Sequence, residues 1–171
     1  MFDFVRRIAL AAAAPAALLA VTAVPAQAAP GGPAGAAAAA QPTTEQVLMA
    51  EVVALTNEQR VANGCGELAV DEELTIASVR QAHYMAATGD FGHIGWRGST
   101  FESRAEAIGY DYVAAENVGW GYSGAAGVMD AWMASPGHRA NILNCDVRSF
   151  GAGVQRAVNG TYYWAQVFGY R

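Results

Sequence analysis

The sequence predicts an α+β fold, in which a mainly antiparallel central sheet lies between two layers of helices as a three-layer α-β-α sandwich. Three observations support this fold class. Several segments between residues 43 and 142 have the apolar spacing or the end signals of helices. A strong hairpin signal follows within residues 149–171. Both faces of that hairpin are largely apolar, so helices are expected to cover the sheet on both sides.

The first two helices are marked at both ends. Thr43, with Gln46 three residues later, forms a capping box, and this helix is expected to end near residues 63–64. Its apolar face is formed by Leu48, Val52, Leu55 and Ala62. The second helix is expected to begin at Asp71, where acidic residues favour the unpaired N–H groups, and to end at Gly89.

Shorter elements are expected in the middle of the chain. Ser99 and Glu102 form another capping box, which predicts a short helix that stops at Gly109. The segment "YDYVAAENVGW" that follows has the aromatic and β-branched residues typical of a strand. Helical spacing resumes over residues 123–134, and Pro136 marks the first position of a further helix.

The C-terminal hairpin is predicted from Asn159-Gly160, because a two-residue turn requires positive φ at both positions. Such a turn would pair Val154 with Ala165 and Gly153 with Gln166. One face would then carry Phe150, Ala152, Val154, Tyr163 and Val167, and the other would carry Trp164 and Phe168 over Gly151 and Gly153.

Residues 1–28 have the pattern of a secretory signal peptide, with two arginines, the apolar run "IALAAAAPAALLAVTAV" and small residues in "AQA". A membrane anchor is the alternative. However, the run is rich in Ala and contains Pro15, whereas a span needs roughly 20 strongly apolar residues. Residues 29–42 hold only Ala, Gly, Pro and one Gln, so a linker is expected there, followed by a single domain over residues 43–171.

Charge and cysteine content narrow the possible partners. The net charge is −5, and removal of residues 1–28, with their one acid and two arginines, would make it −6. Such a chain is not expected to bind nucleic acid or an anionic membrane through bulk charge. Cys65 and Cys145 are an even pair, which in a secreted chain favours a disulfide bond; two free buried thiols are the alternative.

The run "SPGHRANIL" places His138 in the first turn of a helix, with Ser135 as the N-cap residue type. The positive end of a helix disfavours protonation and would keep a neutral imidazole available to a metal ion. A packed or surface histidine is the alternative. A Ser-His nucleophile has less support, because an N-cap oxygen would be occupied by a backbone N–H and there is no "GxSxG" elbow.

Two further residues could share a site with His138. His93 lies in the glycine-rich segment "DFGHIGWRG", and Glu116 lies in an apolar strand, where an unpaired buried carboxylate would be costly. Glu116 could be met by a backbone amide or an arginine, or by a water or ion that it shares with the histidines. His83, inside the second helix, is interpreted as a packed helix residue.

Five segments in order resemble the bacterial branch of the CAP superfamily, which includes cysteine-rich secretory proteins, insect venom antigens and plant pathogenesis-related proteins. The resemblance to this SCP-like extracellular domain extends over nearly all of residues 43–171. The segments are "LTNEQRVANG", "HYMAATGDFGH", "AENVGWGY", "WMASPGHRANILN" and "YYWAQVFG".

The resemblance implies an α-β-α sandwich with a central cleft, where two histidines and two glutamates form a tetrad able to hold a divalent ion. His93, Glu116 and His138 match three of these positions. The second glutamate position is occupied by Ser135, which removes the spare carboxylate that would serve as general base for a metal-bound water. Two imidazoles and one carboxylate suit zinc, with magnesium as the alternative.

The function implied is a secreted, monomeric binding module whose cleft holds a divalent cation and a small or lipid-like ligand. The alternative is a metal-dependent extracellular hydrolase of peptide or cell-wall material, with His93 and His138 as ligands and Glu116 as base. A carboxylate near the histidines in place of the missing one, with Asp130 the nearest in sequence, would favour the hydrolase. A third class, a non-catalytic wall-associated protein, lacks support from any repeat or basic tract.

The signal pattern predicts a mature N-terminus at Ala29, because Ala26 and Ala28 occupy the small-residue positions before the cleavage point. N-terminal sequencing of the protein recovered from the culture medium checks this. A sequence that begins at Met1 would contradict it.

Overall fold

The computed structural model describes residues 41–171, so the expected signal peptide and all but the last two residues of the expected linker lie outside the described part. The helices are α1 (Thr44–Ala62), α2 (Glu72–Thr88), α3 (Phe101–Glu106), α4 (Ala125–Ala134) and α5 (Pro136–Ile142), with a 3₁₀ turn, η1 (Trp96–Gly98). The strands are β1 (Ala69–Val70), β2 (Val113–Trp120), β3 (Ser149–Arg156) and β4 (Tyr162–Gly169). No helix within residues 41–171 has the length and apolar character needed to cross a membrane.

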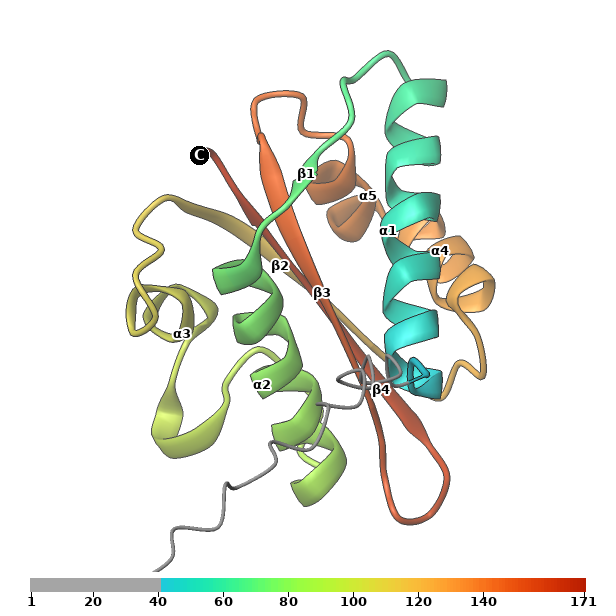
Figure 1. Ribbon diagram of the computed structural model, residues 1–171, viewed down its shortest axis with the longest axis vertical. Coiled ribbons are helices and arrows are strands. Elements are labelled where there is room, and N and C mark those ends of the chain that lie inside the picture. Colours follow the sequence, from blue (N-terminus) through green and yellow to red (C-terminus); the bar gives the residue numbers. More distant parts are fainter. Residues whose placement is uncertain (1–40) are drawn as a thin grey trace, which may run out of the picture. The chain divides into compact units, whose positions relative to one another are not determined.

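The expected three-layer α-β-α sandwich is confirmed. The sheet has the order β1-β3-β4-β2, with α1, α4 and α5 on one face and α2 and α3 on the other (Figure 1). The larger core cluster, on the α1 and α4 side, includes Trp132, Trp164 and Phe168, and a second cluster under α2 includes Leu74 and Tyr110. The sheet is mixed rather than purely antiparallel, because the short β1 pairs in parallel with β3.

Local signals placed the starts of α1 and α2, but both ends of α3 differ from the expectation, and this helix ends at Glu106 rather than at Gly109. Thr43 and Gln46 form the expected capping box, and the Asp71 carboxylate caps α2. The box of α3 was expected at Ser99 and Glu102 but consists of Thr100 and Ser103. Ser99 lies outside this helix because its carbonyl oxygen closes the preceding turn by accepting the N–H of Gly95.

The predicted hairpin register was wrong by one residue. Phe150 pairs with Phe168 and Val154 with Trp164, because the loop holds three residues rather than two. The Ala157 N–H donates to the Thr161 carbonyl, and Gly160 takes the left-handed conformation at φ 91°. The shift brings five apolar residues into one core cluster: Phe150, Ala152, Val154, Trp164 and Phe168.

The other face of the hairpin lets α2 approach the sheet closely. A Cβ atom built on Gly151 would overlap the backbone of Thr75, and one built on Gly153 would overlap the backbone of Ser78. Because α2 lies directly on these glycines, its position over the sheet is fixed. The start of the loop that follows α2 is therefore fixed as well.

The end of α5 is tied to the end of α1. Cys65 and Cys145 form the expected disulfide bond. The buried guanidinium of Arg60 donates to the carbonyl oxygens of Gly66, Ile142 and Asn144 at 2.7–2.9 Å. These contacts hold α5, and therefore His138, against the rest of the domain.

We expect the double substitution Cys65→Ala and Cys145→Ala to lower the free energy of unfolding by about 4 kcal/mol, less any strain in the bond, because the bond closes a loop with a sequence separation of 80. Urea denaturation of the variant and the wild type measures the difference. Two reactive thiols per chain in the denatured, unreduced wild type would refute the bond.

Candidate functional site

The centre of the site is the side chain of Glu116, which projects from β2 and has no exposed surface. Its Oε1 accepts a hydrogen bond from His93 Nδ1 at 2.9 Å, and its Oε2 accepts one from Arg104 Nη2. Arg104 is 6% exposed, whereas the His93 side chain is 51% exposed. The negative charge of Glu116 is therefore balanced inside the protein by Arg104. His93 is the member of the site that is exposed to solvent.

Arg104 is the site residue that sequence reasoning missed. It lies in α3, and its Nη1 also donates to the carbonyl oxygens of Ser99 at 2.8 Å and His93 at 3.2 Å. One guanidinium thus holds both the carboxylate and the loop that carries His93. The only signal in the sequence was the expectation that a buried Glu116 needs a partner.

His138 reaches the site from the opposite layer, in the first turn of α5. Its carbonyl oxygen accepts a hydrogen bond from Asn117 Nδ2 at 3.2 Å, and Asn141 Nδ2 donates to Asn117 Oδ1 at 2.8 Å. Because Asn117 is the neighbour of Glu116 on β2, this network fixes α5 beside the carboxylate. No hydrogen bond joins the imidazole of His138 to Glu116 or His93 in the described residues.

The pKa values of the two imidazoles are shifted in opposite directions, and the charge of His93 contributes to the shift of His138. The hydrogen bond that His93 donates to Glu116 raises the pKa of His93 above its ordinary value, against a smaller opposing effect of burial. Burial lowers the pKa of His138, and repulsion from His93 lowers it further. The site therefore favours a charged His93 beside a neutral His138.

A pocket of about 290 Å³ opens beside His138. Aromatic side chains, Phe91, Trp120, Tyr122 and Trp132, form much of its wall, together with Ser135. Ser135 holds the N-cap position of α5, but its side chain makes no capping hydrogen bond, contrary to our expectation. It lines the pocket instead, so its hydroxyl group is not occupied by the helix.

The described residues contain no group of three or more His, Cys, Asp or Glu side chains placed to hold a metal ion. Glu116 is engaged through both oxygens, and Ser135 supplies no carboxylate. Asp130 lies exposed on α4 and does not line the pocket. His83, interpreted as packed, is exposed, because the buried face of α2 is formed by other residues.

Residues 53–168 match the sequence model of the cysteine-rich secretory protein family, CAP. This chain belongs to that family. It is 33% identical over 129 residues to the uncharacterized protein YkwD of Bacillus subtilis (strain 168), and 28% identical over 117 residues to the uncharacterized membrane protein YlbC of the same organism. The alignments include 74% and 68% of this chain but only 49% and 33% of those relatives.

Solved structures share the CAP fold at lower identity. An outer surface protein of Borrelia burgdorferi superposes with a TM-score of 0.67 at 20% identity over 74% of this chain and 94% of that one. An extracellular protein with an SCP domain from Bacillus anthracis gives a TM-score of 0.64 at 23% identity, over 77% of this chain and 45% of that one. These similarities establish the fold of the CAP domain.

We expect the two site histidines to titrate on opposite sides of the ordinary histidine pKa of about 6.5, His93 above it and His138 below it. Charged His93 then stabilises the fold below about pH 6.5, and this contribution is lost as the pH rises through its raised pKa. Neutral His138 has the opposite effect, since stability falls as the pH drops from about 6.5 through its lowered pKa. NMR titration of the imidazole resonances measures both values.

The substitution His93→Gln should raise the pKa of His138, because it removes a positive charge nearby. His83→Gln is the matched control and should leave His138 unchanged, since the repulsion that lowers the pKa of His138 comes from His93 and not from His83. An unchanged His138 in His93→Gln would contradict the coupling.

Proposed function

We propose that this CAP domain is a secreted, monomeric binding module rather than an enzyme, and that the cleft beside His93 and His138 takes a divalent cation and a small or lipid-like ligand. The proposal rests on the hydrogen bonds of Glu116, whose two carboxylate oxygens accept from Arg104 and His93. A carboxylate held in this way orients an imidazole and cannot act as a free base.

The alternative of a metal-dependent hydrolase lacks a general base. Such a base must reach the water from which it takes a proton, and Glu116 has no exposed surface. The position of the second family glutamate is occupied by Ser135, and Asp130 does not line the pocket. These facts favour binding over catalysis.

The donor set suits a weakly held ion. His93 Nδ1 is bound to Glu116, which leaves Nε2 as its metal-binding nitrogen, and a carboxylate behind a histidine is the usual outer shell of a metal site. His138 is kept neutral, as a ligand must be, whereas His93 must lose its proton to bind, which weakens the affinity for the ion. Two imidazoles favour zinc over magnesium, which prefers oxygen ligands. A bound ion would supply a positive charge and open coordination positions for a ligand.

Secretion is supported by the signal pattern in residues 1–28 and by the family. The similar structure from Bacillus anthracis is described as an extracellular protein, and that from Borrelia burgdorferi as an outer surface protein. The net charge of −5 gives no basis for nucleic-acid binding.

We expect one zinc ion per chain, with weak affinity at pH 7.5, and loss of binding in His138→Ala and in His93→Ala. His83→Ala is the matched control and should bind as the wild type does, because it removes an exposed imidazole outside the cleft. Isothermal titration calorimetry of the purified mature protein with zinc chloride measures all four proteins.

Two outcomes would contradict the proposal. Zinc binding that survives in both His93→Ala and His138→Ala would place the ion elsewhere. Zinc-dependent hydrolysis of a peptide or a cell-wall fragment that is abolished in Glu116→Gln would show that the domain is an enzyme.

A further inference from the structure

The pocket beside His138 is walled by aromatic rings from four parts of the chain. They are Phe91 in the loop after α2, Trp120 at the end of β2, Tyr122 in the segment that follows, and Trp132 in α4. Trp132 is 2% exposed, whereas Phe91 and Trp120 are 47% and 55% exposed, with 6.3 Å between their ring centroids. The pocket thus combines a buried aromatic ring with a pair of aromatic rings that are open to solvent.

Two of these rings are positioned by the fold itself. The indole N–H of Trp132 donates to the carbonyl oxygen of Val118 at 3.0 Å. The carbonyl oxygen of Tyr122 accepts the indole N–H of Trp164 at 3.1 Å, and the ring of Tyr122 lies against Gly127 of α4. Because these surfaces are ordered before anything binds, a ligand would lose less free energy in arranging them.

The pocket also offers polar groups that the protein does not use. The hydroxyl groups of Ser135 and Tyr122 and the imidazole of His138 make no hydrogen bond to any other residue within residues 41–171. A hydroxyl group both donates and accepts, and a neutral imidazole does so through its two nitrogens. No Asp, Glu, Lys or Arg lines the pocket. These groups suit a neutral ligand that is rich in hydroxyl groups.

A pyranose sugar combines the two kinds of surface that this pocket can contact. In a gluco-configured ring the hydroxyl groups lie at the edge, and the two faces carry C–H groups, which are slightly positive and stack on the electron-rich faces of aromatic rings. The pocket volume of about 290 Å³ is at the lower limit of small-ligand pockets, so it suits a single sugar ring. The exposed rings of Phe91 and Trp120 extend the aromatic surface beyond it.

Aromatic walls also suit a quaternary ammonium ion, which is attracted to the faces of such rings. Two observations disfavour this occupant. No acidic side chain lines the pocket, so the cation would meet no opposite charge there. His93 favours its charged form and acts on His138 by repulsion, so it would repel a second cation as well. The neutral sugar is therefore favoured.

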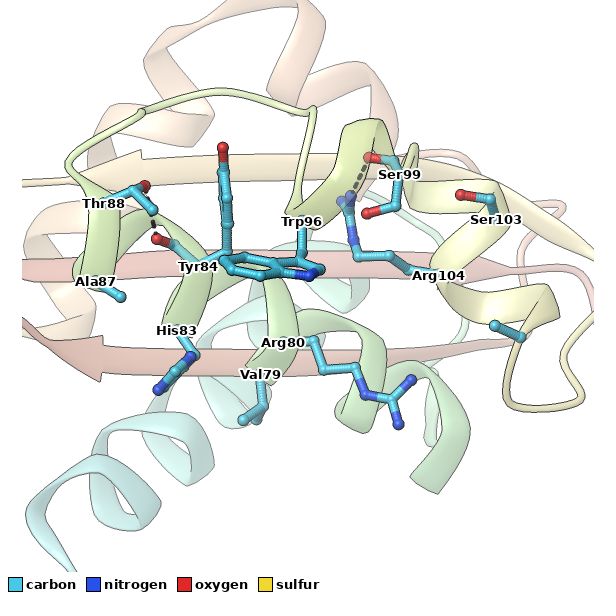
Figure 2. A pocket seen from close by; sticks show the side chains of 11 residues that line it. Val79, Arg80, His83, Tyr84, Ala87, Thr88, Trp96, Ser99, Ser103 and Arg104 are labelled. Atoms are coloured by element: carbon cyan, nitrogen blue, oxygen red, sulfur yellow. Dashed lines mark hydrogen bonds between the residues drawn. The ribbon is translucent and has the colours of Figure 1, made fainter.

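A second and larger pocket, of about 610 Å³, provides an internal comparison. It lies between α2 and the segment formed by η1 and α3, and Trp96, which is 67% exposed, forms part of its wall (Figure 2). This larger pocket shares no lining residue with the pocket beside His138, and its lining includes Arg80 and Arg104. Trp96 is thus a matched control for Trp120, because both are exposed tryptophans but they line different pockets.

We propose that the pocket beside His138 binds one neutral, gluco-configured pyranose ring of an oligosaccharide. A face of the ring stacks on the aromatic wall, its hydroxyl groups contact Ser135, Tyr122 and His138, and the next sugar ring lies on Trp120. This inference rests on the proposed function, because it names the ligand of the same cleft. It does not require that zinc be bound.

Isothermal titration calorimetry of the purified mature protein with cellotriose and with triacetylchitotriose tests the proposal, with EDTA present to exclude metal ions. At least one of these neutral trisaccharides should bind saturably, with one molecule per chain, and choline should not compete with it. Absent or unsaturable binding of both sugars overturns the proposal. Displacement of the sugar by choline at equal concentration overturns it as well.

Three variants locate the ligand. Trp120→Ala should weaken binding of the trisaccharide by about tenfold or more through loss of stacking, and Trp96→Ala should leave it unchanged. Ser135→Ala should weaken it by about two- to tenfold, the effect of one hydrogen bond, and the start of α5 should survive because this side chain makes no capping bond. Equal binding by Trp120→Ala and the wild type, or equal losses in Trp120→Ala and Trp96→Ala, would place the sugar elsewhere and overturn the proposal.

The zinc titration of the wild type separates this inference from the proposed function. If zinc binds through the two histidines and neither sugar binds in EDTA, the identity of the ligand is wrong and the cation site stands. If a sugar binds with the expected response to Trp120→Ala while zinc does not bind, the cation site is wrong and the sugar site stands.

Discussion

The ion pair between Arg104 and Glu116 is the interaction on which the rest of the site depends. A carboxylate without exposed surface on a central strand requires a partner, and loss of one member of such a pair typically costs about 3–5 kcal/mol. Arg104 is also bonded to the carbonyl oxygens of His93 and Ser99. The conformation of the loop after α2 and the position of α3 are therefore tied to the charge of Glu116.

This pair makes the two histidines unequal. His93 is bonded to Glu116 and favours the charged form. His138 makes no hydrogen bond or ion pair to a carboxylate among the described residues and favours the neutral form. Burial is the larger cause of the lowered pKa of His138, and Ser135, which lines the same pocket, brings no carboxylate to offset it. The position of His138 is instead set by its main chain, through Asn117 and the attachment of α5 to α1.

Features encoded within a few residues could be predicted from the sequence, and those that depend on distant residues could not. Thr43 and Gln46, or Asp71 and the start of α2, interact within one helical turn, so their types suffice to locate a helix end. Asn159-Gly160 located the turn, but the same dipeptide fits a loop of two or three residues, and the choice changes the register. β1 has only two residues, too few to show any periodicity.

The candidate site shows the same limit. The family motifs identified His93, Glu116 and His138. They did not identify Arg104, because all ten basic residues of the chain are arginines and the sequence does not distinguish among them. The packing of α3 against β2 selects Arg104 as the partner of the buried carboxylate.

The contacts of Arg104 explain why this position requires an arginine rather than a lysine. The guanidinium group is planar and presents five N–H donors in fixed directions, and here one terminal nitrogen faces Glu116 while the other faces two carbonyl oxygens. A lysine, with one ammonium nitrogen, could not occupy both positions. The third nitrogen, Nε, remains without a protein partner among the described residues, in a side chain that lines the larger pocket. The side chain that neutralises the buried carboxylate thus also lines a pocket of about 610 Å³ beside α2, in addition to its contacts with Glu116 and the His93 loop.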